Sequence, residues 1–166
     1  VLGRSFCGWV CPVGSLLVEV QPFVVITRND IILLDCGLGF TNPDGTLQIH
    51  QNLINNHINP LDVTIVLLSH LHKDHAGGAC MEDRQLKQSF LSFPHATYYV
   101  NKQELAFAAE KGSPSYIPSE LEVLHASEKV QLIEGEGLIG ETIRYALTGA
   151  HSPYHQVFWI EEDGKT

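Results

Sequence analysis

The segment that most constrains this chain runs from Leu67 to Gly78 and reads Leu-Leu-Ser-His-Leu-His-Lys-Asp-His-Ala-Gly-Gly. It places three imidazoles and one carboxylate within six residues, at His70, His72, Asp74 and His75. Imidazole nitrogens and carboxylate oxygens are the usual protein ligands of zinc and neighbouring transition metals in catalytic sites. In an extended stretch His70 and His72 point to the same side and can share one ion, while the two later ligands lie past a bend and can reach a second. Packing alone does not account for such a density, so the segment predicts a metal site.

The apolar pattern of the flanking residues predicts strands and helices that carry this segment into the protein interior. Val63 to Leu68 is apolar apart from Thr64, which suits a strand buried on both faces of a layered sheet. The other expected strands are Val18–Thr27 and Ile31–Leu34, joined as a hairpin, then Thr97–Val100, Val130–Glu134, Thr142–Leu147 and Gln156–Glu161. The expected helices are Leu47–Ile58 and Lys102–Lys111, the second followed by a polar loop through Pro114 and Pro118. Strands and helices in this order imply an α/β sandwich.

Composition narrows the class of partner. The 166 residues fit one domain, and a formal net charge of −9 disfavours nucleic acid or an anionic membrane surface as the main partner. A small-molecule substrate is the better expectation. No apolar run approaches the roughly 18 residues of a membrane span. Four cysteines are too few for the framework of a small secreted scaffold, so a reducing cytoplasm is expected. Nothing in the sequence indicates the oligomeric state.

The metal-ligand pattern also resembles a known family. His70-x-His72-x-Asp74-His75 followed by Gly-Gly is similar to the signature of the metallo-β-lactamase superfamily. Two further elements extend the resemblance from about residue 15 to the end of the chain. The strand-end Asp-x-Gly is matched at Asp35, and the stretch 148–155, Thr-Gly-Ala-His-Ser-Pro-Tyr-His, resembles the family's Thr-Pro-Gly-His-Thr-Pro-Gly-His element. The resemblance implies an αββα sandwich over residues 15–166.

By this resemblance His151 completes the ligand set of a first ion with His70 and His72, and Asp74 with His75 contributes to a second. Zinc is the expected metal, with two ions in the complete protein, and iron, cobalt or manganese are the alternatives. Asp35 would lie beneath the metal loop, and His155 would support the site without ligating. Ser152 and Tyr154 stand where the family has Thr and Gly, which predicts a more crowded wall near the second metal ion. The family's bridging Asp and final His would fall beyond residue 166, so the fold is expected to be C-terminally truncated here.

The resemblance implies hydrolysis by a metal-bound hydroxide, with Asp74 as the catalytic residue that accepts or passes on the proton. The residues of the motif are most similar to those of N-acyl-homoserine lactonases and related lactone or ester hydrolases. A glyoxalase II-like thioesterase is the nearest alternative, and a zinc β-lactamase is less favoured because Asp74 is followed by His75. A flavodiiron-type oxidoreductase would carry Glu in place of His72. A non-catalytic metal-binding fragment stays open, because the downstream ligands are missing.

Residues 1–14 form a separate element. Their Cys7-x-x-x-Cys11-Pro pattern resembles polyferredoxin-type quinol dehydrogenases, a family unrelated to the rest of the chain. An iron–sulfur cluster normally takes four thiolate ligands, and two are present. We therefore expect an atypical leader without an assigned role for either cysteine.

Overall fold

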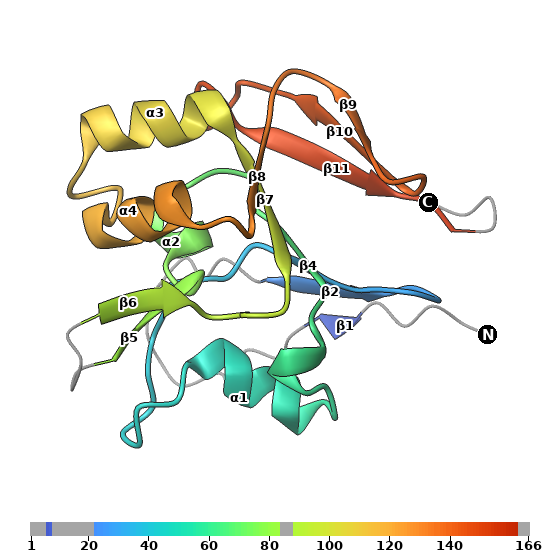
Figure 1. The fold of residues 1–166 in the computed structure, drawn as a ribbon, viewed down its shortest axis with the longest axis vertical. Coiled ribbons are helices and arrows are strands. Elements are labelled where there is room, and N and C mark those ends of the chain that lie inside the picture. Colours follow the sequence, from blue (N-terminus) through green and yellow to red (C-terminus); the bar gives the residue numbers. More distant parts are fainter. Residues whose placement is uncertain (1–5, 8–21, 84–87, 163–166) are drawn as a thin grey trace.

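Two stacked β-sheets with helices on one outer side make up the computed structural model, which describes residues 6–7, 22–83 and 88–162. Figure 1 shows the layers. The larger sheet has six strands in the order β1-β2-β3-β4-β7-β8. Their bounds are β1 Phe6–Cys7, β2 Phe23–Ile26, β3 Ile31–Leu34, β4 Ile65–Leu67, β7 Thr97–Asn101 and β8 Val130–Ile133. Strands β2 and β3 form the predicted hairpin, whereas β3, β4, β7 and β8 run parallel to their neighbours.

The second sheet is antiparallel and has three strands in the order β11-β10-β9. They span β9 Gly137–Ile139, β10 Ile143–Leu147 and β11 Gln156–Ile160. A separate hairpin joins β5 Cys80–Asp83 to β6 Gln88–Leu91. The helices are α1 Gln48–Asn55, the short η1 Pro60–Asp62, α2 Lys73–Ala76, α3 Lys102–Lys111 and α4 Pro118–Ala126.

Strand β4 is buried on both faces, as its apolar run predicts. Because successive side chains of a strand point to opposite faces, Val66 and Leu67 enter different cores. Val66 packs in the core between the larger sheet and helices α1, α3 and α4, and Leu67 packs in the core between the two sheets. Both side chains are fully buried. A strand held on both sides is a rigid base for the loop that follows it.

The structure confirms the α/β sandwich and corrects its details. Pro118 was expected in a loop but begins helix α4, where a proline at the first position costs no hydrogen bond. Leu121 and Leu124 then bury one face of that helix. Helix α1 ends at Asn55 rather than Ile58. Strands β5, β6 and β9 were not predicted, because their short stretches lack a run of β-branched residues.

Part of the predicted architecture falls outside what the structure describes. The first predicted strand, Val18–Thr27, is described only from residue 22 onward. Within residues 22–83 and 88–162, no helix covers the outer face of the second sheet, and none is long and apolar enough to cross a membrane.

Candidate metal centre

Three histidine side chains from two distant loops converge at the end of β4. His70 and His72 lie in the loop between β4 and α2, and His151 lies in the loop between β10 and β11. The Nε2 atom of His70 is 3.1 Å from Nδ1 of His72, which is 3.1 Å from Nε2 of His151. The family resemblance implies that these residues surround one ion, and the structure brings their ring nitrogens within 4.8 Å of one another.

Backbone contacts explain why the second loop arrives at this point. Gln156, the first residue of β11, is completely buried. Its backbone N–H donates to the carbonyl of Ser69 at 2.9 Å, and its side-chain amide donates to the carbonyl of Leu68 at 2.9 Å. These two bonds join the start of β11 to the end of β4, so the loop that carries His151 must close over His70.

Burial and the neighbouring imidazoles lower the pKa of two of the clustered histidines, His70 and His72. Burial, followed by the neighbouring imidazoles, lowers the pKa of His70 to about 2. Burial also lowers the pKa of His72, helped by His151 and opposed by Glu104. A neutral imidazole offers a lone pair, which is the form that binds a metal ion. Each such ring has one nitrogen without a proton.

The arrangement of donors fits a bound cation. The three ring nitrogens lie within 4.8 Å of one another, and two of the pairs are 3.1 Å apart. Lone pairs held this close repel unless protons or a cation lie between them. Protonation is opposed by the lowered pKa of His70. A set of three imidazoles is a known ligand set of catalytic zinc sites. The residues present therefore suit a divalent metal ion.

Asp74 and His75 lie beside this cluster on α2. The ring of His75 is 4.0 Å from that of His70, centroid to centroid, and 6.4 Å from that of His151. Its Nε2 atom is 4.0 Å from an oxygen of Asp74, whose side chain is 34% exposed. Both groups thus border the site from the same side, but they are not part of the three-nitrogen cluster.

Asp35 organises the loop from below, as the sequence resemblance implied. Its carboxylate accepts hydrogen bonds of 2.8 Å each from the backbone and the hydroxyl of Ser69. It is also 2.8 Å from Nδ1 of His75. A proton on that nitrogen leaves Nε2 of His75 as the free acceptor. Asp35 has a φ of 58°, a left-handed conformation that Asp tolerates better than most residues, and it puts the carboxylate under the loop.

The two glycines after the motif are required by close backbone packing. Neither Gly77 nor Gly78 has a positive φ, so their dihedral angles do not require glycine. A Cβ atom at Gly78 would instead collide with the carbonyl of Cys36, and one at Gly77 with the carbonyls of Lys73 and Leu38. Glycine is needed here because two backbone segments pass in direct contact.

The loop around His151 has its own internal support. Nδ1 of His155 is 2.7 Å from the hydroxyl of Thr148, and its ring lies 5.2 Å from that of His70, centroid to centroid. Burial lowers the pKa of His155. Tyr154 packs its ring edge-on against Phe107 at 5.9 Å.

Sequence reasoning missed two buried polar side chains that hold the centre together. Gln156 has the role described above, and Glu104 of α3 contacts both histidine-bearing loops. Glu104 follows Asn101, whose side chain caps the helix by accepting from the backbone N–H groups of Gln103 and Glu104. An acidic residue in the first turn after such a cap is common for local reasons, so its sequence signal points only to helix capping.

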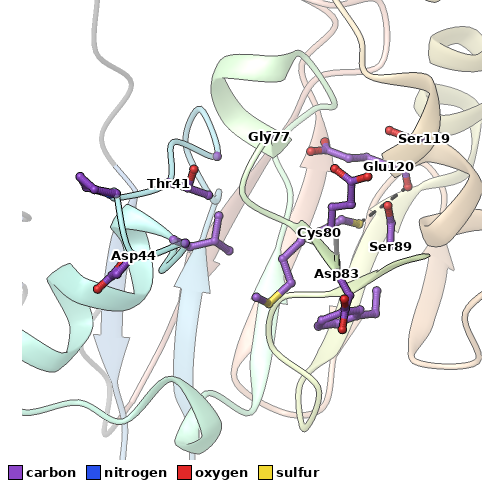
Figure 2. A pocket seen from close by; sticks show the side chains of 15 residues that line it. Thr41, Asp44, Gly77, Cys80, Asp83, Ser89, Ser119 and Glu120 are labelled. Carbon is purple, nitrogen blue, oxygen red and sulfur yellow. Dashed lines mark hydrogen bonds between the residues drawn. The ribbon is translucent and has the colours of Figure 1, made fainter. Parts of the chain in front are cut away.

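A cavity of about 830 Å³ lies away from these histidines, between the loop after β3 and the hairpin β5–β6. Figure 2 shows Thr41 and Asp44 on one side and Cys80, Ser89 and Glu120 on the other. None of the histidines of the metal cluster lines it. Cys80 lies within it, with its thiol toward the carbonyl of Glu120 at 3.9 Å. Burial raises the pKa of that thiol, as expected for a cysteine that packs rather than reacts.

Comparison with known proteins adds two family matches. The model of the metallo-beta-lactamase superfamily matches residues 17–166, and the model of a 4Fe-4S binding domain matches residues 1–25. In the second match, Cys11 and the side chain of Cys7 lie outside the residues that the structure describes. No curated protein matches the chain.

Three solved structures illustrate the structural similarity. A probable metal-dependent hydrolase from Staphylococcus aureus aligns with a TM-score of 0.70 and 22% identity, over 86% of this chain and 54% of that chain. AidC, a dizinc quorum-quenching lactonase, aligns with a TM-score of 0.67 and 25% identity, over 88% of this chain and 53% of that chain. An N-acyl homoserine lactone hydrolase, with its product bound at the catalytic metal centre, aligns with a TM-score of 0.64 and 23% identity, over 87% of this chain and 59% of that chain. The chain therefore spans about half the length of these proteins.

Proposed function

The chain belongs to the metallo-β-lactamase superfamily, and on this basis we propose that it forms the metal-binding half of a metal-dependent hydrolase. The observation that carries the proposal is the convergence of three imidazoles, whose ring nitrogens lie within 4.8 Å of one another. In the proposal, His70, His72 and His151 hold one divalent ion, and Asp74 and His75 contribute to a second in the complete protein. We propose zinc for both positions, because three imidazoles are a familiar zinc ligand set.

A divalent ion in this position would supply an activated water molecule and polarise the scissile carbonyl of the substrate. The protein's own residues would prepare the site for it. Asp35 orients His75 by accepting from Nδ1, which leaves the other ring nitrogen free to ligate. Asp74 is partly exposed beside the cluster, so it can accept a proton from the attacking water and return it to the leaving group.

The substrate that we propose is a small carboxylic ester, most specifically a lactone. One structural neighbour is an N-acyl homoserine lactone hydrolase, and another is a quorum-quenching lactonase with an N-acyl-homoserine product bound, which supports this class. The formal charge of −9 supports a small molecule over nucleic acid. The free, buried thiols of Cys36 and Cys80 are compatible with action in a reducing cytoplasm, which we also propose.

The proposal is tested by metal removal from the complete protein. Chelation should abolish hydrolysis of an N-acyl homoserine lactone, and zinc, cobalt or manganese should restore it. His70→Ala should lower both metal content and turnover, while the matched control His125→Ala, at an exposed position of α4, should leave both unchanged. Turnover that survives thorough chelation would refute the mechanism. If the protein binds metal and hydrolyses a glutathione thioester but no lactone, the thioesterase alternative is favoured. If it binds metal and hydrolyses neither substrate, a non-catalytic role is favoured.

A further inference from the structure

Glu104 is an acidic side chain buried in the protein interior, with only 1% of its surface exposed. It lies in the first turn of α3, outside every motif that defines the candidate metal centre. A carboxylate in such a place is costly unless hydrogen bonds satisfy its oxygens. Its partners therefore indicate what it does.

Those partners come from both of the loops that carry the clustered histidines. The Oε1 atom accepts from the backbone N–H of Leu71, the residue between His70 and His72, at 3.1 Å. The Oε2 atom accepts from the hydroxyl of Ser152, the neighbour of His151. One carboxylate thus bridges two segments that are far apart in the sequence: His72 and His151, one from each segment, are 79 positions apart.

A third contact links Glu104 to the wall of the site. The hydroxyl of Tyr116 donates to Oε1 at 3.4 Å, and the ring of Tyr116 packs against that of His72 at a centroid distance of 4.9 Å. The loop before Tyr116 also holds the metal loop, because the carbonyl of Ser115 accepts from the backbone N–H of Lys73 at 2.9 Å. Glu104 is therefore connected to His72 both through the backbone and through a packed ring.

We propose that Glu104 is a positioning residue that sets the distance between the two histidine loops and so preorganises the metal centre. This inference rests on the proposed function, since it assumes that the clustered histidines bind a metal. A carboxylate suits the role because its two oxygens accept only, and three donors from three segments point at it. Ser152 gains a role from the same geometry: its hydroxyl ties the loop of His151 to α3.

The test measures cobalt and zinc affinity of the complete protein by competition with a chromophoric chelator, with the cobalt absorption spectrum as a report on ligand geometry. Glu104→Ala should weaken affinity about 10- to 100-fold, the usual effect of losing a group that orients metal ligands, and should change the spectrum. Glu104→Gln keeps one acceptor oxygen and should fall between the unaltered protein and Glu104→Ala.

Two control variants on the same helix separate positioning from general stability. Leu105→Ala removes a buried side chain next to Glu104 and should lower the melting temperature without changing cobalt affinity. Glu110→Gln, at an exposed position, should change neither. Ser152→Ala should weaken affinity in the unaltered background but have little further effect in Glu104→Ala, because both remove the same bridge.

The outcomes distinguish failure of the proposed metal binding from failure of the positioning role. If the unaltered protein binds no cobalt or zinc, the proposed function fails and this inference fails with it. If the unaltered protein binds metal and Glu104→Gln and Ser152→Ala bind it equally well with the same spectrum, only the positioning role is overturned. The same holds if Leu105→Ala weakens affinity as much as Glu104→Ala at a matched loss of melting temperature. Should Glu104→Ala fail to fold, Glu104→Gln and Ser152→Ala still decide.

Discussion

Replacing Asp35 by asparagine changes one functional group beneath the metal loop and nothing of its shape. The carboxylate now accepts from the backbone N–H of Ser69, from its hydroxyl and from Nδ1 of His75, each at 2.8 Å. An asparagine side chain has one acceptor oxygen, and its other end donates. If that oxygen keeps the backbone bond, the new amide N–H groups face the Ser69 hydroxyl and His75.

The loss in the free energy of unfolding depends on how many of these hydrogen bonds the asparagine cannot accept. Two hydrogen bonds to a charged acceptor, at about 1.5–3 kcal/mol each, set an upper range of about 3–6 kcal/mol. His75 can recover one of them by moving its proton to Nε2, so that Nδ1 accepts from the new amide. We therefore expect the free energy of unfolding to fall by about 1.5–3 kcal/mol. The moved proton blocks the nitrogen proposed to ligate, so metal affinity at the second position should fall about 10- to 100-fold.

The assay for Asp35→Asn combines urea unfolding of the metal-free protein with cobalt titration of the folded protein. Asp62→Asn, an exposed acidic residue of η1, is the matched control for loss of a charge. A variant that keeps its stability within about 0.5 kcal/mol, the usual range for surface substitutions, and also keeps its full cobalt stoichiometry would refute the role of Asp35.

Two further predictions concern Glu120, which lines the cavity away from the histidines, and two residues of the motif itself. Burial raises the pKa of Glu120 from 4.5 to about 8. Between these pH values the folded protein keeps a proton that the unfolded chain releases, so the free energy of unfolding should fall as the pH rises from about 4.5 to 8. Urea unfolding at about pH 5 and pH 9 should show that Glu120→Gln removes up to about 5 kcal/mol of this decline, and an unchanged slope would contradict it. Asp74→Asn should reduce turnover of the complete protein by about two to four orders of magnitude while the first ion stays bound, whereas Lys73→Ala, at an exposed position, should change little. Elemental analysis alongside turnover checks both, and equal damage from the two variants would contradict the assigned roles.

The part of the site that sequence predicted well is the part built from local information. The loop between β4 and α2 follows a strand whose apolar run requires burial, so both its position and its contents can be read from neighbouring residues. The hairpin of β2 and β3 and the helix α3 were predictable for the same reason. The placement of His151 came from a family resemblance, because no local pattern ties it to a loop so far away in the chain.

What sequence did not reveal are the side chains whose partners are distant. Gln156 begins a strand with an amide that is unremarkable by itself, and only the folded chain shows it bonded to Leu68. Helix α4 is not evident from the sequence, because proline is typical of loops as well as of the first position of a helix. In each case the residue type permits two local structures, and tertiary packing selects between them.

Glu104 shows why such residues matter for function. Its local pattern, an acidic side chain after an asparagine cap, is complete without any tertiary partner. The folded chain uses the same side chain to join the loops of His72 and His151, whose facing nitrogens are 3.1 Å apart. A metal centre needs its ligands fixed to within about 0.5 Å, and flexible loops do not provide this by themselves. The motif therefore supplies the ligand atoms, while buried acceptors outside the motif supply their spacing, and a search for motifs alone finds only the first of these.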